Sequence, residues 1–277
     1  MDRLRTVWLH ELRWPEVEAY LARCDIALVP IGATEQHGRH LPMLVDTGWA
    51  EAASLLAARS ADVVVTPPLA FGWSPHHMGY PGTITLGADT LRSAVRDICN
   101  SLIYHGFKRI VIVNGNRIAN LQPLEIAAVE LINRTGAHVV VADTGLIARA
   151  EVKALCELGS DGLDHAGEAE SSFAMHWAGG HVDLAAASPH VPRNAPPPRF
   201  DYPTELDPAL NGNALSRFVT PQRHRAATAP DGTAGDPSTA TAEKGRAMIE
   251  AIASALIAVI EEVRAAEVGE TRAELPV

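Results

Sequence analysis

Residues 25–38 read DIALVPIGATEQHG, an apolar run that ends in a polar loop. Residues 26–31 are apolar throughout, which predicts a buried strand. Glu35 and His37 follow at a spacing of two, so in an extended chain their side chains point the same way and can face one ion. A polar loop that merely closes a strand has the same composition. The pair by itself therefore leaves a metal site and a structural loop both open.

Asp46 stands at the start of a helical pattern that continues to Arg59. Asp is a preferred N-cap residue, and a cap contributes about 1 kcal/mol to helix stability. A carboxylate that follows Glu35 and His37 so closely is also a metal-ligand type. The two roles do not exclude each other, so Asp46 is predicted as a ligand, a cap or both.

Strands and helices alternate along the chain. Helical patterns are predicted at 15–23, 46–59, 89–105 and 121–133, and β-rich runs at 25–31, 62–66, 108–113 and 137–142. Continuous Val and Ile runs separated by helices indicate an α/β fold with a mainly parallel sheet covered on both faces. Ligands bind such sheets at the carboxyl ends of the strands. The loop after residue 31, the loop at 71–83 and the turn at 114–116 are therefore expected to meet at one rim.

The loop at 71–83 contains Trp73, His76 and His77, which are candidates for a substrate pocket. Ordinary packing of the loop explains the same residues. Further along, residues 188–237 are rich in Pro, which is typical of a lid, an arm or an interface element. A C-terminal helix is predicted at about 238–264, with an apolar stripe for the core or a subunit contact.

The composition bounds the class of protein. With 277 residues, 47% of them hydrophobic, the chain can form one large domain, and we predict a single domain over 1–277. A formal charge of −10 argues against a nucleic-acid partner. No apolar run suits a membrane span, so we expect a cytoplasmic protein. Cys24, Cys99 and Cys156 suit reduced thiols better than a disulfide framework.

Four separated segments, in order, resemble the creatininase family of metal-dependent amidohydrolases. The first is the string from Gly32 to Pro42 with Asp46. The others are residues 76–86 (HHMGYPGTITL), residues 164–172 (DHAGEAESS) and residues 232–245 with their Gly-Asp-Pro and Ala-Glu-Lys-Gly elements. The resemblance implies a three-layer α/β/α sandwich, a centre of one or two divalent ions (Zn, Mn or Fe) and a homo-oligomer, with a hexamer as one form.

The resemblance also implies roles for individual residues. Glu35, His37 and Asp46 match metal ligands, and Asp46 matches a carboxylate that bridges two ions. Glu170 matches a further acidic ligand, while His165 and Glu168 match the segment where proton transfer and substrate contacts take place. The alternative for this last segment is the first turn of a helix, where acids favour the helix dipole.

One family motif is altered. After the strand at 108–113 the family has a His ligand where this chain has Asn116, and Ile118 stands where some members have an acid. An Asn oxygen is a weak ligand, poor for Zn, so the set for two ions is incomplete. His76 or His77 is a possible replacement. Arg117 adds a fixed positive charge that either grips an anionic substrate or faces solvent.

Three functions remain open at this point. The first is hydrolysis of a small amide, such as a creatinine-like lactam, a formamide or a short peptide, with a metal-activated water and a proton carried by His165 or Glu168. The second is a rebuilt metal enzyme for a non-hydrolytic step such as amide or lactam formation, in which Arg117 takes part in catalysis. The third is a non-catalytic oligomeric binding protein.

Overall fold

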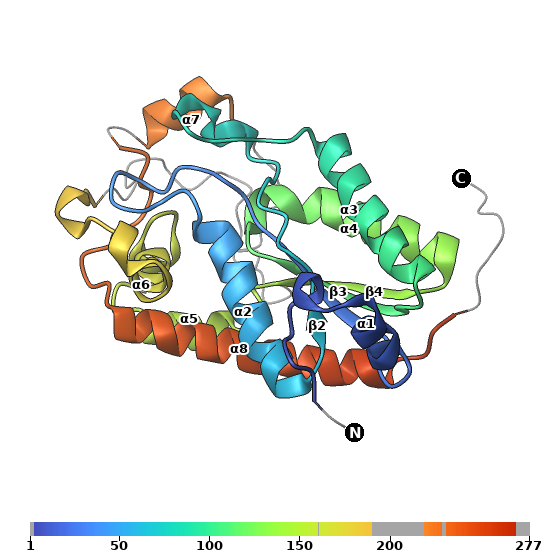
Figure 1. Cartoon of the computed structure of the whole chain (residues 1–277). Helices are drawn as coiled ribbons and strands as arrows, with labels where there is room; N and C mark the ends of the chain where they lie inside the picture. The colour runs from blue at the N-terminus through green and yellow to red at the C-terminus, as the bar shows by residue number, and fades with distance from the viewer. Residues whose placement is uncertain (1–2, 160, 190–218, 229–230, 270–277) are drawn as a thin grey trace.

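A four-stranded parallel sheet lies at the centre of the protein, with strand order β2-β1-β3-β4 (Figure 1). The computed structural model describes residues 3–159, 161–189, 219–228 and 231–269. The strands are β1 (Ile26–Ile31), β2 (Val64–Val65), β3 (Arg109–Asn114) and β4 (His138–Asp143). The predicted α/β fold with a mainly parallel sheet is confirmed.

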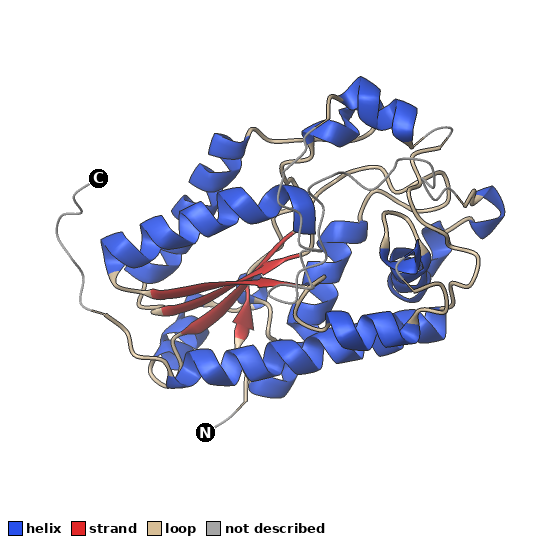
Figure 2. Ribbon diagram, turned by 180° about the vertical axis from the view of Figure 1, so that it is seen from behind, coloured by secondary structure: helices blue, strands red, loops and turns tan. Residues whose placement is uncertain are grey.

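Helices cover both faces of the sheet, which gives the three layers (Figure 2). Helices α2 and α8 pack against each other on one side, and α3 and α4 pack together on the other. The described helices are α1 (Trp14–Leu21), α2 (Val45–Ala61), α3 (Ala88–Tyr104), α4 (Arg117–Thr135), α5 (Arg149–Leu155), α6 (Glu168–Trp177), α7 (Pro221–Ala227) and α8 (Ala242–Ala265). Among them, none is long and apolar enough to cross a bilayer.

The burial of the strands explains their sequences. All six residues of β1 are buried, as are five of the six residues of β3, so both read as continuous apolar runs. Strand β2 lies at the edge and is shorter than the predicted 62–66. Asp62 ends α2 in the left-handed region at φ 53°, which leaves only Val64 and Val65 to pair with β1.

Several predicted helix boundaries are corrected. Helix α2 begins at Val45, and the described structure shows no side-chain hydrogen bond at its N-cap, Leu44. Asp46 is therefore inside the first turn, and the prediction that it caps the helix is wrong. Helix α4 begins four residues earlier than predicted, because the side chain of Asn116 caps it. Helix α7 lies within the predicted arm at 188–237, most of which falls outside the described residues.

The strand ends are aligned, so their loops meet at one rim. Ile31 of β1 pairs with Asn114 of β3, and Asn114 pairs with Asp143 of β4. Two glycines let α2 approach this rim. A Cβ on Gly115 would lie 1.9 Å from the Asp46 carbonyl oxygen, and a Cβ on Gly32 would lie 2.3 Å from the Thr47 backbone. The first turn of α2 is thus held directly against the ends of β1 and β3.

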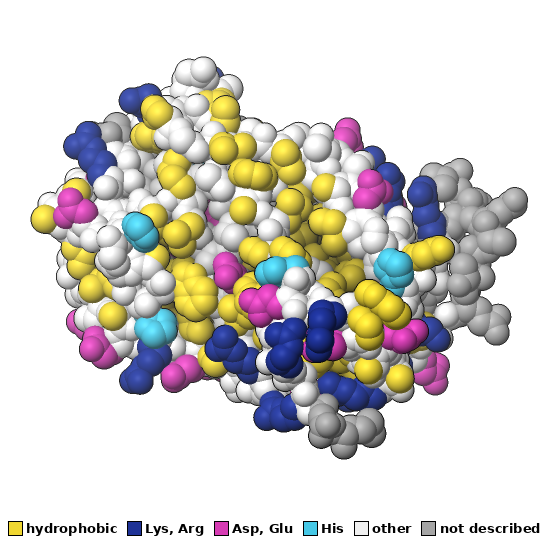
Figure 3. Space-filling view, in the orientation of Figure 1, with side chains coloured by type: hydrophobic (Ala, Val, Ile, Leu, Met, Phe, Trp, Pro, Cys, Tyr) yellow, Lys and Arg dark blue, Asp and Glu magenta, His cyan; other side chains and the backbone are white. Residues whose placement is uncertain are grey.

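Charges are mixed on the face seen in Figure 3. Several Lys and Arg side chains gather over the lower middle of this face, and Asp and Glu side chains lie beside them.

Candidate metal centre and active site

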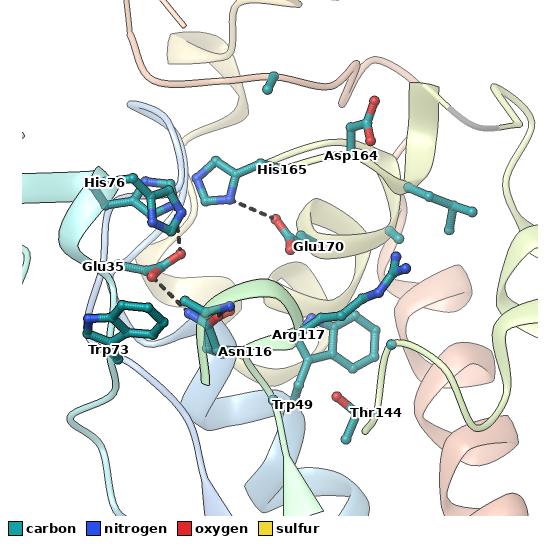
Figure 4. Close-up of a pocket in the computed structure, with 18 of the residues that line it drawn as sticks. Glu35, Trp49, Trp73, His76, Asn116, Arg117, Thr144, Asp164, His165 and Glu170 are labelled. Carbon is teal, nitrogen blue, oxygen red and sulfur yellow. Dashed lines mark hydrogen bonds and ion pairs between the residues drawn. The ribbon is translucent and has the colours of Figure 1, made fainter. Parts of the chain in front are cut away.

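A cavity of about 740 Å³ opens at the rim formed by the ends of β1, β3 and β4. Most of the residues predicted for a site line it, from four separate parts of the chain: Glu35, Asp46, Trp73, His76, His77, Asn116, Arg117, His165 and Glu170. Figure 4 shows Glu35 and Asn116 on one side of the cavity and His165 and Glu170 facing them. The loops that were expected to meet therefore do meet.

His37 lies beside this cavity and is fully buried. Its Nδ1 is 3.1 Å from the Glu35 carbonyl oxygen, so this nitrogen carries the proton and donates it to the backbone. The Nε2 is thus the ring nitrogen left for a metal ion, and it has no hydrogen-bond partner among the described residues. A buried imidazole nitrogen left in this way is an open metal ligand, oriented by its backbone hydrogen bond.

Two carboxylates face this nitrogen. Asp46 Oδ1 is 3.4 Å and Glu170 Oε2 is 3.7 Å from His37 Nε2. Around a tetrahedral ion with bonds of about 2.0–2.2 Å, ligand atoms lie roughly 3.3–3.6 Å apart. Each of the two distances from His37 Nε2 is close to the separation of two ligand atoms on one divalent ion, and the mixed N and O donor set suits Zn, Mn and Fe alike.

The wider cluster offers ligand atoms in three overlapping groups, each within 4.8 Å. They are Glu35 with His37 and Asp46, His37 with His165 and Glu170, and Glu35 with His77 and His165. Glu35, His37 and His165 each belong to two of these groups, so the three groups form one connected cluster.

The electrostatics of the cluster favour a cation. Burial and the nearby Asp46 carboxylate raise the pKa of Glu35 to about 8, and burial raises the pKa of Glu170 to about 6. Burial lowers the pKa of His37, but the carboxylates around it outweigh this effect and raise the pKa to about 10. The carboxyl groups of Glu35, Asp46 and Glu170 share one buried space, and among the neighbouring rings only the His37 imidazole is charged to offset their negative charge. A divalent ion would therefore relieve the repulsion between these carboxylates.

Asn116 does not offer its oxygen to this cluster. Its Oδ1 accepts a hydrogen bond from the Ala119 backbone N–H at 3.3 Å, and its Nδ2 donates to Glu35 and Asp46. The weak metal-ligand role predicted for Asn116 is not supported by this orientation, because the atom that faces the site is a hydrogen-bond donor.

Five imidazoles gather around the cavity, including one that the sequence did not suggest. His77 lies 4.5 Å from His165 and 4.6 Å from His224 between ring centroids, and His76 lies next to both His77 and His224. Burial lowers the pKa of His76 to about 4 and also lowers the pKa of His77, His165 and His224. Apart from His37, these rings are therefore neutral at pH 7.

Glu168 has a different environment from its neighbours in the motif. Its carboxylate accepts a hydrogen bond from Lys244 Nζ at 2.6 Å and from the backbone N–H groups of Glu157 and Leu158. The residue is fully buried and lies outside the described lining of the cavity. In place of the predicted proton transfer, we propose that Glu168 anchors α8 to the segment before α6.

Arg117 lies in the cavity wall, and Figure 4 shows its guanidinium directed toward the side where Asp164 lies. Arg149, at the start of α5, lines the same cavity. Burial raises the pKa of Asp164 to about 6, and both arginines act against this rise. The predicted alternative in which Arg117 faces solvent is therefore not supported.

Four of the residues described here were missed by the sequence interpretation: Gln36, Ser74, Arg149 and His224. The amide of Gln36 contacts both His77 and His165. Ser74 Oγ lies 3.3 Å from Asn116 Nδ2. The alternation of side chains around Glu35 and His37 indicates only that Gln36 points away from the two predicted ligands. Nothing in the local sequence marks the other three residues, because tertiary packing alone brings them to the site.

Comparison with known proteins gives a consistent result. The family described as "Creatininase: Creatinine amidohydrolase" matches residues 10–260. A creatinine amidohydrolase of Pseudomonas putida is 30% identical over 93% of this chain and 97% of its own. A mycofactocin precursor peptide peptidase of Mycolicibacterium smegmatis is 33% identical over 79% of this chain and 78% of its own.

Solved structures agree with the sequence matches. A crystal structure of creatininase superposes with a TM-score of 0.75 at 29% identity, over 95% of this chain and 100% of the other. A creatininase mutant described as "Zn-Zn type" gives the same values. With a family match over most of its length, the chain belongs to the creatininase family.

Proposed function

We propose that this protein is a metal-dependent amidohydrolase that holds a divalent ion between His37, Asp46 and Glu170. The observation that carries the proposal is the buried, unpartnered Nε2 of His37, which faces two carboxylates at ligand spacing. Retention of this set supports an enzyme over the non-catalytic alternative, because burying such a cluster without a cation is costly.

The chemistry that a divalent ion supplies when bound is a lowered pKa for a bound water and a polarised amide carbonyl. His37, Asp46 and Glu170 hold the ion. His165 Nε2 lies 2.8 Å from the backbone oxygen of Gln36, and the other ring nitrogen, Nδ1, lies 3.9 Å from Glu170 Oε2 on the side of the cavity. This nitrogen is placed to take up a proton and deliver it to the leaving amine.

The cavity suits an amide with an apolar part and an anionic group. Its volume of about 740 Å³ lies within the range of small-molecule sites, and Trp49 and Trp73 form part of the wall. Arg117 and Arg149 also line the cavity, and guanidinium groups bind carboxylates and phosphates in bidentate fashion. We propose a small cyclic or linear amide, from a lactam to a short peptide, that presents such a group to Arg117.

The setting of the enzyme is also proposed. Cys24, Cys99 and Cys156 are all free, which suits a reducing cytoplasm. A homo-oligomer, with a hexamer as one form, and a single domain over the whole chain stay predictions from the family resemblance and the sequence.

Removal of the metal tests the proposed function. Protein purified without chelator is expected to contain a divalent ion and to hydrolyse members of a panel of lactams, formamides and short peptides. Dialysis against a chelator should abolish this hydrolysis, and Zn²⁺, Mn²⁺ or Fe²⁺ should restore it, as followed by release of amine and by elemental analysis. Undiminished hydrolysis by metal-free protein would contradict the proposal.

Replacement of Arg117 by alanine tests the substrate class. Hydrogen bonds to a charged group contribute about 1.5–3 kcal/mol, so KM for an anionic amide is expected to rise about 10- to 100-fold with little change in kcat. KM for a matched neutral amide should not change. Arg134→Ala, on the exposed end of α4, is the control and should behave as wild type. A large fall in kcat for both amides would instead place Arg117 in the chemical step.

A further inference from the structure

The side-chain amide of Asn116 lies between two carboxylates of the metal centre. Its Nδ2 is 2.8 Å from Glu35 Oε2 and 3.0 Å from Asp46 Oδ2. Both distances are those of N–H···O hydrogen bonds, and the amide has two N–H groups to donate. The Nδ2 thus occupies the position from which a cation would contact Glu35 and Asp46 together.

The orientation of this amide is fixed by the backbone around it. Asn116 Oδ1 caps α4 by accepting from the Ala119 N–H, so a flip of the amide would place an N–H against an N–H. Asn114 holds the turn from the other side, since its Nδ2 donates to the Asn116 carbonyl and its Oδ1 accepts from the Asn116 N–H. Asn116 is therefore a donor toward the carboxylates.

His77 supplies a second N–H donor to Glu35, because Gln36 determines which nitrogen of the His77 ring carries the proton. Gln36 Oε1 accepts from the Gly38 backbone N–H at 2.9 Å, which leaves Nε2 of the same amide 2.8 Å from His77 Nδ1. An amide nitrogen only donates, so His77 Nδ1 accepts and the proton of the neutral ring lies on Nε2. That Nε2 is 3.2 Å from Glu35 Oε1.

Both oxygens of Glu35 consequently face N–H groups, one from Asn116 and one from His77. The situation at His37 is the opposite, because its free Nε2 faces carboxylate oxygens. The hydrogen-bond network thus divides the cluster into one part, around His37 Nε2, that has no hydrogen bond to this nitrogen, and one part, around Glu35, that donors already fill. The first suits a cation, and the second does not.

We infer that this protein binds one metal ion per chain, and that the N–H groups of Asn116 and His77 take the place of a second cation beside Glu35. Gln36 is the positioning residue that sets His77 as a donor. The inference rests on the proposed metal centre at His37, and it separates this chain from the relative whose structure is described as Zn-Zn.

Metal stoichiometry tests the inference without reference to activity. The full-length wild-type protein is loaded with excess Mn²⁺, freed of unbound ion by gel filtration, and measured by elemental analysis and by electron paramagnetic resonance. One Mn²⁺ per chain and the spectrum of an isolated ion are expected. Two ions per chain with an exchange-coupled spectrum would overturn the inference, and would place the second ion among Glu35, His77 and His165.

Two substitutions of Asn116 carry the test further. Asn116→Asp replaces the N–H donor with a carboxylate of the same shape. A second Mn²⁺ is therefore expected to bind to this variant roughly 10- to 100-fold more tightly than to wild type, which is the range of effects seen for groups that support metal ligands. Asn116→Ala removes the donor without adding charge and should give a smaller increase. If the Asn116→Asp protein does not fold, the Mn²⁺ stoichiometry of the Asn116→Ala protein tests the inference instead.

Asn133→Asp is the matched control, because it makes the same change at an exposed position of α4. It should keep one Mn²⁺ per chain. If both Asn116 variants also stay at one ion, the amide does not exclude the second ion and the inference is wrong. Wild-type protein that binds no ion would overturn the proposed metal centre and this inference with it, whereas one bound ion without hydrolysis would overturn only the proposed reaction.

Discussion

Replacement of His37 by alanine is expected to remove metal binding and hydrolysis together. The substitution deletes the buried Nε2 that faces Asp46 and Glu170. Loss of groups that merely support a ligand lowers metal affinity about 10- to 100-fold, so loss of this ligand should lower it by at least about 100-fold. Hydrolysis should fall about 10³-fold, since several kcal/mol of charge stabilisation are lost and about 1.4 kcal/mol corresponds to a factor of ten.

The measurements are metal titration by calorimetry and amine release under saturating substrate. His176→Ala is the control, because His176 is exposed on α6, and it should bind metal as wild type does. Thermal unfolding in the presence of a chelator separates a folding defect from loss of the ligand. A His37→Ala protein that folds and binds metal with unchanged affinity would show that the ion lies elsewhere in the cluster.

Replacement of Glu168 by glutamine is expected to lower stability by about 3 kcal/mol while leaving kcat unchanged. The carboxylate is fully buried, and Lys244 Nζ contacts it at 2.6 Å. Breaking a buried ion pair leaves the partner charge uncompensated, which costs about 3–5 kcal/mol, and the partly exposed lysine places this case near the lower end. Chemical unfolding gives the stability, and kcat per folded molecule reveals any catalytic role.

Glu157 offers a matched control because it pairs with the same lysine. Its side chain is 66% exposed and lies 2.7 Å from Lys244 Nζ, so Glu157→Gln should cost less than about 1 kcal/mol. A large loss of kcat in Glu168→Gln, with stability preserved, would restore the proton-transfer role first predicted for this residue.

The stability difference between wild type and Glu168→Gln should also depend on pH. Burial opposes ionisation of Glu168, but the hydrogen bond from Lys244 and those from backbone N–H groups outweigh it and lower the pKa in the folded state. A lowered pKa means that the unfolded chain binds the proton more readily. The contribution of Glu168 is therefore complete above the unfolded value of about 4.3 and is lost as the pH falls through the lower folded value.

Much of the fold followed from the pattern of apolar residues. The strands β1, β3 and β4 lie within one residue of the prediction at each end, because strands buried on both faces must be apolar throughout. Strand β2 and helix α4 were placed less well. The end of β2 depends on how Asp62 terminates α2, and the start of α4 depends on the cap formed by Asn116, both of which are details of local geometry that periodicity does not contain.

For the site, the sequence predicted the residues that gather at the rim better than it predicted the contacts of each side chain. The family resemblance predicted Glu35, His37, Asp46 and Glu170 as metal ligands, and the structure brings these four side chains into one cluster. It did not show that Glu168, two residues from Glu170, turns to Lys244 instead. Adjacent positions on a helix point in different directions, and what each one meets depends on the packing of α6 against α8.

Sequence by itself thus determined the parallel sheet, the rim at its carboxyl edge and the ligand types that gather there. Only the tertiary structure decided which atoms of those side chains face one another. Asn116 is the clearest case: its residue type permits an oxygen ligand or a nitrogen donor, and the cap on Ala119 selects the donor. The choice depends on hydrogen bonds between segments up to about 80 residues apart in sequence, such as that from Asn116 to Glu35, and no local pattern records such contacts.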